Sequence, residues 1–403
     1  MSYIQRGTRT FRMANLALFA GGFNTFAILW GTQPLLPDIA KEFHISPAVS
    51  SLSLSSTTIA LAISMLIAGS LSEVFGRKPV MTISLVASSI LAILTAYSPT
   101  FHLLIFFRIL QGVVLAGLPA VAMAYLGEEI EPPSLGMAMG LYISGNSIGG
   151  MGGRIISGIL TDYFNWHVAL IGIGIISLLA SLVFWAILPK SNHFTARKFE
   201  LHSLVKSLFS QFKEPGLIYL FAIGFLLMGS FVSLYNYIGF QLIAPPYSLS
   251  QTLVGFIFIV YIVGTFSSTW MGMLADQHGR RKILQVSLFI LLIGACITLN
   301  TNLWIKIIGI AIFTYGFFAG HSIASGWIGQ LATHDKAQAS SLYLFFYYVG
   351  SSIGGTTGGA FYSGYGWFGV VAMIVVLTII GILLSIRLGF VAKKRMKLSS
   401  HSI

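Results

Sequence analysis

Long apolar runs make up most of the chain, and short polar turns separate them. A run of about 20 predominantly apolar residues is long enough to cross a lipid bilayer as a helix. We predict twelve such helices, near residues 13–36, 49–71, 80–97, 101–126, 135–160, 167–188, 216–241, 252–274, 283–300, 303–330, 338–363 and 367–390. The pattern therefore predicts an all-α integral membrane protein.

The two halves of the chain carry matching motifs. GSLSEVFGRK, which begins at Gly69, corresponds to GMLADQHGRR, which begins at Gly272, and each lies between the second and third predicted helices of its half. GNSIGGMGG at Gly145 and GSSIGGTTGG at Gly350 repeat in the fifth helix of each half. This duplication predicts two pseudo-symmetric six-helix bundles. We place them at residues 1–188 and 216–403, the second with a short cytoplasmic tail, joined by a cytoplasmic linker over 189–215.

The linker contains an amphipathic segment. Its apolar residues have helical spacing, at Leu201, Leu204, Val205, Leu208 and Phe212. Such a helix either lies flat on the inner leaflet or packs on the protein itself. Neither alternative makes it a functional site.

Composition and charge agree with burial in lipid. Only 8% of residues are charged, 56% are hydrophobic, and the mean hydropathy is +0.85. With the N-terminus inside, most of the 23 Lys and Arg residues fall in cytoplasmic loops, which is the distribution that orients membrane proteins. The net charge of +12 therefore sets the topology and predicts no nucleic-acid partner.

The sequence offers no catalytic motif. It has no nucleotide-binding loop and no zinc-protease motif, and Cys296 is its one cysteine. We therefore predict that the protein is not an enzyme and holds no cofactor, metal or intramolecular disulfide.

The repeated loops resemble those of the major facilitator superfamily. The family signature is Gly-x-Leu-small-acid-x-x-Gly-Arg-basic, and the chain matches it twice, at Gly69, Leu71, Ser72, Glu73, Gly76, Arg77 and Lys78, and at Gly272, Leu274, Ala275, Asp276, Gly279, Arg280 and Arg281. The fourth helix carries the similar Arg-x-x-Gln-Gly element at Arg108, Gln111 and Gly112.

Two further stretches resemble the twelve-helix drug:proton antiporter branch of that family. QPLLPDIAKEF ends the first helix, and the fifth helix has glycines at the intervals of the branch's exporter motif, at Gly140, Gly149 and Gly153. The chain departs from the branch at Arg154, where proline is usual.

The resemblance implies a monomeric, multi-pass transporter in the bacterial cytoplasmic (inner) membrane, with both termini cytoplasmic. It would couple the efflux of a small organic compound or drug to protons by alternating access. An organic-anion or sugar transporter, acting as an importer or facilitator, is the alternative. A non-transporting membrane receptor is a third.

Each repeated loop sets an acid at the inner end of one helix and two bases at the start of the next. Glu73 is expected to pair with Arg77 or to bond a helix N-terminus, where the helix dipole favours an anion. Such a pair contributes about 1 kcal/mol, which biases a conformational equilibrium without fixing it. We interpret the loops as a cytoplasmic latch, with simple turns and topological anchors as the alternative. The latch residues are Gly69, Glu73, Gly76, Arg77, Lys78, Gly272, Asp276, Gly279, Arg280 and Arg281.

Glycines recur every fourth residue in the fifth helix of each half. They lie on one helical face, at Gly145, Gly149 and Gly153, and again at Gly350, Gly354 and Gly358. Small residues on one face let another backbone approach closely. We expect close packing first, and second a flexible seam between halves that rock against one another.

Two arginines, Arg108 and Arg154, fall within predicted helices, about 10 Å from the outer boundary. A buried arginine is costly unless it is paired or faces water, so a functional role is the first hypothesis. Asp38, at the outer end of the first helix, is the preferred partner of Arg108, with Arg154 as a third member or a substrate contact. A static salt bridge between these helices is the alternative.

Proton coupling requires a group that changes charge, which arginine does not. Asp38 is one candidate. His321, inside the tenth helix, is the other because the ordinary pKa of histidine lies near neutrality. The alternative role of His321 is a hydrogen-bonded packing residue.

Polar and aromatic residues on inward-facing helices are the candidates for a substrate cavity. Apolar walls with a few polar groups suit amphiphilic small molecules. Two arginines without acids in the helix cores favour anionic or neutral substrates. The candidates, each of which could equally be structural, are Asn24, Gln33, Asn146, Asn236, Tyr237, His321, Trp327, Tyr347 and Tyr348.

Overall fold

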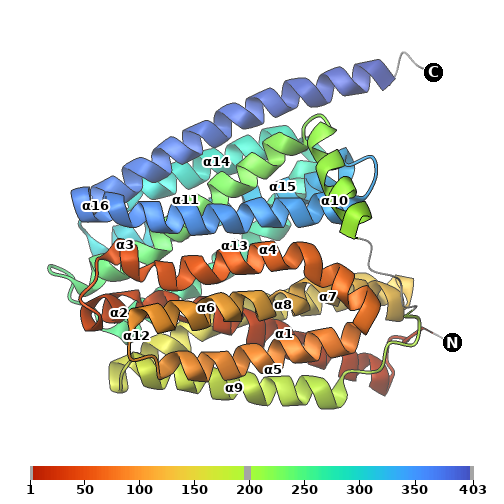
Figure 1. The fold of residues 1–403 in the computed structure, drawn as a ribbon. Helices are drawn as coiled ribbons and strands as arrows, with labels where there is room; N and C mark the ends of the chain where they lie inside the picture. Colours follow the sequence, from red (N-terminus) through yellow and green to blue (C-terminus); the bar gives the residue numbers. More distant parts are fainter. Residues whose placement is uncertain (1–2, 195–200, 400–403) are drawn as a thin grey trace. The chain divides into compact units, whose positions relative to one another are not determined.

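The structure is a computed structural model that describes residues 3–194 and 201–399 (Figure 1). Within these ranges the regular structure is helical, and one isolated bridge pairs Ile4 with Ile130. In chain order the elements are α1 (Arg9–Gly31), η1 (Gln33–Leu35), α2 (Leu36–Glu42), α3 (Pro47–Ser50), α4 (Leu52–Phe75), α5 (Arg77–Ala96), α6 (Phe101–Leu115), α7 (Gly117–Glu129), α8 (Pro132–Tyr163), α9 (Trp166–Ile187), α10 (Leu201–Ser210), η2 (Gln211–Lys213), α11 (Leu217–Ile243), α12 (Gln251–Phe256), η3 (Ile257–Val260), α13 (Tyr261–His278), α14 (Arg280–Ile297), α15 (Leu303–Leu331) and α16 (Lys336–Ser399).

The predicted all-α membrane fold is confirmed. Every predicted span overlaps a helix, and nine segments of the described chain are long and apolar enough to cross a membrane. One of these segments, Lys336–Phe390, contains two of the predicted spans. Two other spans are less apolar, because α8 holds eight glycines and α14 begins with Arg280, Arg281 and Lys282.

Prolines and glycines break two of the predicted spans, the first and the fourth. The first span ends as α1 at Gly31 and continues through η1 and α2, which begin near Pro34 and Pro37. A proline is tolerated in the first turn of a helix, where no N–H is needed, but it cannot continue the helix before it. The fourth span divides into α6 and α7. α16 joins two helices at Gly366, whose φ of 60° is outside the helical range, and this break falls between the predicted spans 338–363 and 367–390.

Packing divides the described chain into two compact units. Unit 1 contains residues 3–45, 52–194 and 248–258, and unit 2 contains residues 46–51, 201–247 and 259–399. A short segment of each half therefore packs with the other unit. In unit 1 the segment 248–258, which carries α12, lies against α8. In unit 2 the short helix α3 lies against α16.

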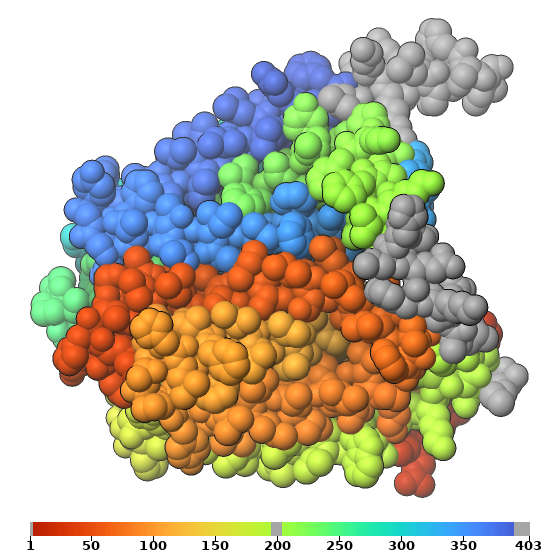
Figure 2. All heavy atoms as spheres, in the orientation of Figure 1, coloured from red at the N-terminus to blue at the C-terminus, as the bar shows by residue number. Residues whose placement is uncertain are grey.

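Each unit is held by long helix–helix contacts. In unit 1, α1 packs along α8 and α9, α5 packs along α9 and α6, and α4 packs along α6 (Figure 1). Side chains of α4 and α6 form a continuous surface in the space-filling view (Figure 2). In unit 2, α11 packs along α16, and α15 packs along α13 and α14.

The repeated glycines lie where two backbones touch. A Cβ atom at Gly149 would lie 2.3 Å from the carbonyl oxygen of Phe23, and one at Gly354 would lie 2.5 Å from the Cα atom of Gly229. The other repeated glycines line the same two crossings, Gly145 and Gly153 against α1, and Gly350 and Gly358 against α11. Each of these faces therefore packs against a helix of its own unit.

Glycines also lie at the contacts of the segments 248–258 and 46–51, which we call the exchanged segments. In unit 1, a Cβ atom at Gly158 would lie 2.7 Å from the carbonyl oxygen of Gln251 and 3.1 Å from the Cα atom of Gly255. In unit 2, a Cβ atom at Gly359 would lie 2.3 Å from the Cα atom of Ala48. Only glycine allows this approach, because any side chain would push the short segment away.

Candidate functional site

The first hinge loop, residues 69–78, turns at Gly76 and sets Arg77 at the start of α5. The φ of Gly76 is 95°, a conformation that favours glycine. The Arg77 guanidinium donates to both carboxylate oxygens of Glu128 on α7, at 2.6 and 3.1 Å, and to the Ser72 hydroxyl at 2.5 Å. Glu73 lies 4.0 Å away. The main partner of Arg77 is therefore Glu128. We had expected Glu73 instead.

Sequence reasoning missed Glu128 because it is 51 residues from Arg77 along the chain. It ends the fourth span, and only the packing of α7 beside the loop brings the two charges together. The neighbouring Lys78 donates from Nζ to the carbonyl oxygen of Leu188 at 2.5 Å. Gly69 lies 3.8 Å from the carbonyl oxygen of Ala120, measured from an added Cβ atom, so α4 passes close to α7.

The second hinge loop, residues 272–281, has the same turn with different partners. Gly279 has a φ of 92°, and Arg280 donates to Asp276 at 2.8 Å, four residues earlier. Arg281 lies over the ring of Phe390 at 5.0 Å. Gly272 lies near Ser322 on α15. The two loops are therefore alike in backbone and unlike in the ion pairs they make.

Arg108 is fully buried and ties three helices of unit 1 together. Its side chain donates to the carbonyl oxygen of Ser53 at 2.7 Å, to that of Leu29 at 3.4 Å, and to the side chain of Gln111. Within the described part of the chain, no carboxylate lies at ion-pair distance from it. Carbonyl dipoles satisfy the guanidinium, which favours a structural role for this residue.

The expected pair of Asp38 and Arg108 does not form. Asp38 accepts a hydrogen bond from the side-chain amide of Gln251, which belongs to the exchanged segment in unit 1. The break at Pro34 puts Asp38 on the separate helix α2. The α6 guanidinium meets carbonyl groups of its neighbours instead.

Arg154 lies on α8 and is 1% exposed. It donates to the side chain of Gln33 at 2.7 Å and to the carbonyl oxygen of Gly150 at 2.7 Å. The rings of Trp30 and Phe258 lie 4.9 and 4.7 Å from its guanidinium carbon. Contacts of this kind stabilise a buried cation. The structure thus joins Gln33 to Arg154 and leaves Arg108 apart from both.

Two of the predicted cavity residues of unit 1 lie between helices. Asn24 is fully buried and donates to the carbonyl oxygen of Ser177 at 2.7 Å and to the hydroxyl of Ser181 at 2.6 Å. Asn146 lies against Gly22 at the crossing of α8 and α1. Asn24 therefore joins α1 to α9 and is not a cavity residue in this structure, because burial between three helices leaves it no open side.

His321, on α15 of unit 2, lies in a cluster of aromatic rings. Its Nδ1 atom is 2.9 Å from the hydroxyl of Tyr343, and its ring centre is 4.6 Å from that of Tyr347 and 6.1 Å from that of Phe317. The cluster continues from Phe317 through Phe231, Tyr235, Tyr261, Phe313 and Phe318. It is a cluster of packed aromatic rings that carries one imidazole and the hydroxyls of four tyrosines.

The remaining predicted cavity residues of unit 2 are scattered. Tyr237 bonds the carbonyl oxygen of Gly355 on α16, and Asn236 is buried beside it on α11. Tyr348 is buried next to Tyr347. Trp327 lies near the second hinge loop, on the lining of a small cavity. The structure therefore brings only Tyr347 together with His321.

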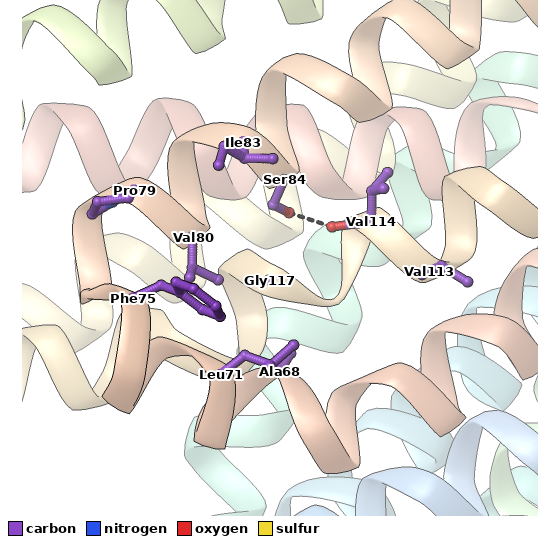
Figure 3. Close-up of a pocket in the computed structure, with 10 residues that line it drawn as sticks. All are labelled: Ala68, Leu71, Phe75, Pro79, Val80, Ile83, Ser84, Val113, Val114 and Gly117. Carbon is purple, nitrogen blue, oxygen red and sulfur yellow. Dashed lines mark hydrogen bonds between the residues drawn. The ribbon is translucent and has the colours of Figure 1, made fainter. Parts of the chain in front are cut away.

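A larger apolar hollow opens on unit 1 between α4, α5 and α6–α7 (Figure 3). Its volume is about 480 Å³, and its walls are Ala68, Leu71, Phe75, Pro79, Val80, Ile83, Ser84, Val113, Val114 and Gly117. The one hydroxyl, on Ser84, donates to the carbonyl oxygen of Val114 at 2.6 Å. No free polar group of the lining faces a ligand, so this hollow offers no chemistry for recognition.

Comparison with known proteins agrees with this architecture. A family model described as "Major Facilitator Superfamily" matches residues 18–245 and 226–402. The chain is 56% identical over 393 residues to the "Uncharacterized MFS-type transporter YybF" of Bacillus subtilis, covering 98% of this chain and 96% of that protein. It is 47% identical over 386 residues to the "Inner membrane transport protein YnfM" of Escherichia coli, covering 96% and 93%. The "Multi-drug resistance efflux pump PmrA" of Streptococcus pneumoniae is 26% identical over 365 residues, with 87% and 89% covered.

Solved structures share the fold. A bacterial homologue of the human lysosomal transporter Spinster, in an inward-facing and occupied conformation, matches with a TM-score of 0.81 at 16% identity, over 96% of this chain and 98% of that one. A mutant of the nucleoside transporter NupG matches with a TM-score of 0.78 at 14% identity, over 93% and 99%. The chain belongs to the major facilitator superfamily and is a membrane transporter of that family.

Proposed function

We propose that this transporter is a proton-coupled exporter of small organic compounds. It would lie in the bacterial cytoplasmic membrane as a monomer, with both termini in the cytoplasm. Its halves, residues 1–188 and 216–403, would give access to the two sides in turn. The excess of Lys and Arg in the predicted cytoplasmic loops supports this orientation. The likeness to a relative named as an efflux pump supports the direction of transport.

The observation that carries the proposal is the aromatic cluster around His321. Of the nine histidines in the chain, His321 is the one in the interior of a predicted span. Histidine is the side chain whose ordinary pKa lies nearest neutrality, so it can take up and release a proton in a transport cycle. The Tyr343 hydroxyl, 2.9 Å away, can accept or donate a hydrogen bond as the imidazole changes its charge.

The same cluster supports the choice of substrate. Its rings offer flat apolar surfaces, and aromatic groups of a ligand gain from stacking or edge-on contact with such rings. The apolar ring faces and the few polar groups, the imidazole and the tyrosine hydroxyls, together suit an amphiphilic organic molecule. Protonation of His321 would weaken the binding of a neutral or cationic compound here, which is the exchange that antiport requires.

The exchanged segments support alternating access. The segment 248–258 reaches unit 1 by the contact of Gln251 and Gly255 with Gly158, and α3 reaches unit 2 by the contact of Ala48 with Gly359. Among the described residues these contacts are made by backbone and polar groups, such as the hydrogen bond from Gln251 to Asp38, and include no ion pair. They would separate at moderate cost when the transporter opens on that side.

Transport in proteoliposomes tests the proposal. A fluorescent amphiphilic aromatic dye should move against its gradient when a pH gradient is imposed, and dye transport should produce proton flux. His321→Gln should abolish the coupling while dye exchange in the absence of a pH gradient persists. His278→Gln, a change of the same kind in the exposed second hinge loop, is the matched control. Dye transport that ignores the pH gradient in the wild-type protein would disprove proton coupling.

Arg154 favours a second candidate function, the transport of organic anions. Its guanidinium is buried among the side chain of Gln33, a carbonyl group and two rings, where a substrate carboxylate would find a strong partner. Arg154→Gln should then reduce transport of anionic compounds more than that of neutral ones. Equal loss for both classes, with the protein still folded, would argue against this function.

A further inference from the structure

The two hinge loops differ in the carboxylates that their arginines bind. In unit 1, the Arg77 side chain is 9% exposed and holds a carboxylate from the inner end of the neighbouring span, that of Glu128. In unit 2, α15 is the corresponding fourth span, and its inner end carries Trp327 and Gln330 but no acid. Among the described residues, Arg280 therefore pairs with one carboxylate, that of Asp276, which precedes it across the turn at Gly279.

A cavity lies where unit 1 has its carboxylate. Its volume is about 280 Å³, and we call it the hinge-loop cavity, lined by Ala275, Asp276, Gly279, Arg280, Trp327 and Gln330. The Arg280 side chain is 20% exposed, so most of it is held by the protein. An added Cβ atom at Gly326 would lie 2.8 Å from an Arg280 nitrogen, which shows that the guanidinium rests on the α15 backbone.

Trp327 adds a second donor to this lining. It is 8% exposed and lines the hinge-loop cavity, and its indole N–H makes no hydrogen bond among the residues that the structure describes. The amide of Gln330 is exposed on the same lining. Three kinds of donor thus surround a space that holds one acceptor, Asp276, at its edge.

We propose that the hinge-loop cavity binds a phosphate group, which Arg280 holds in the way that Arg77 holds the Glu128 carboxylate. The second edge of the Arg280 guanidinium and the Trp327 N–H would donate to it, with Gln330 closing the open side. A tetrahedral phosphate offers several oxygens to donors that converge from α14 and α15, and arginine binds it with two parallel hydrogen bonds.

Such a phosphate could come from an inner-leaflet phospholipid or from a free cytosolic compound. The chemistry at Arg280 is the same for both. In either case the ligand would take the place that the Glu128 carboxylate has beside Arg77 in unit 1. The stability of the second hinge loop would then depend on whether the surroundings of the protein supply a phosphate.

Binding can be measured on the purified full-length protein in detergent micelles. One series adds dioleoyl phosphatidylglycerol, with dioleoylglycerol as the phosphate-free control, and native mass spectrometry counts bound lipid. The other adds inorganic phosphate, with chloride at equal ionic strength as the control. A phosphate-bearing probe should raise the Tm of the wild-type protein by about 2 °C. A response to the lipid alone or to inorganic phosphate alone identifies the source.

Variants locate the site. Arg280→Gln should weaken the binding at least about tenfold, which is the loss of one strong charged contact. Lys282→Gln removes an equal charge two residues away from an exposed position and should leave the binding within about twofold. Trp327→Phe removes only the N–H donor and should weaken the binding several-fold, which keeps the test valid if Arg280→Gln fails to fold.

Gln330→Glu provides the opposite test. A carboxylate at this position would give Arg280 an internal partner, so the variant should fold with a Tm at or above that of the wild type and should lose its response to phosphate. Absence of any response in the wild-type protein would overturn the proposal. So would a response that survives in both Arg280→Gln and Gln330→Glu, or one that Lys282→Gln removes as fully as Arg280→Gln.

Discussion

Replacing Glu128 with Gln should destabilise unit 1 far more than the same replacement of Glu73. Both acids lie near Arg77, but the Glu128 carboxylate receives two hydrogen bonds from its guanidinium, at 2.6 and 3.1 Å, whereas Glu73 is 4.0 Å away. The Glu128→Gln variant keeps the size of the side chain and removes only the charge. It therefore isolates the ion pair from the packing of α7.

The magnitude follows from burial. A fully buried pair costs about 3–5 kcal/mol when one partner is removed, and an exposed pair costs about 0–1 kcal/mol. Arg77 and Glu128 are 9% and 30% exposed, so solvent screens the pair in part and we expect a loss of about 2 kcal/mol. Glu73 is 40% exposed, and its removal should cost less than about 0.5 kcal/mol.

Thermal unfolding of the purified variants measures this difference. At about 2 °C per kcal/mol for a chain of this size, Glu128→Gln should lower the Tm by about 4 °C and Glu73→Gln by less than about 1 °C. In an Arg77→Gln background the effect of Glu128→Gln should almost vanish, because the pair is already broken. Equal losses for the two single variants, or an undiminished effect of Glu128→Gln without Arg77, would refute the reasoning.

Three other properties can be checked by simple substitutions. Gly149→Ala should cost about 1–3 kcal/mol, because its Cβ atom would lie 2.3 Å from the Phe23 carbonyl oxygen; Gly140→Ala, with nothing within 4 Å, is the control, and equal Tm values would contradict the crossing. Asn24→Leu should lower the free energy of unfolding by about 2 kcal/mol, because hydrogen bonds are lost, and should leave the KM for substrate unchanged. A changed KM would indicate that Asn24 contacts the substrate. The Ser207 hydroxyl, 2.5 Å from Asp335, lowers the pKa of that carboxyl. The stabilisation is therefore complete above its ordinary pKa of 3.8 and is lost as the pH falls through the lowered value, so the Tm difference between wild type and Asp335→Asn should be present at neutral pH and disappear in acid.

The predicted spans were accurate where the pattern alone decides. Length and hydropathy placed a helix at every expected position, because a segment in lipid must satisfy its own backbone hydrogen bonds. The break before Pro34 was missed, since it lies inside a run that remains apolar through the break. The proline marked it, but an apolar run hides such a signal. The break at Gly366 falls between the predicted spans 338–363 and 367–390.

The predicted partners of charged residues were less accurate. Glu73 was the predicted partner of Arg77 because both belong to the first hinge loop. An acid that is near in sequence is the natural choice when only sequence distance is known. The structure selects Glu128 because α7 packs beside α5. Asp38 likewise bonds Gln251, which is 213 residues away, and not Arg108. Sequence spacing carries no information on which helices are neighbours.

The sequence by itself determined that this protein is an all-α membrane transporter with a duplicated six-helix plan, because apolar length and repeated motifs are properties of contiguous residues. The tertiary structure alone decided which groups meet: Arg154 with Gln33 and two rings, His321 with Tyr343, and Arg280 with an open cavity. The physical reason is that a buried polar group takes the nearest acceptor in space. For these side chains, the helices packed beside them decide whether an acceptor is present.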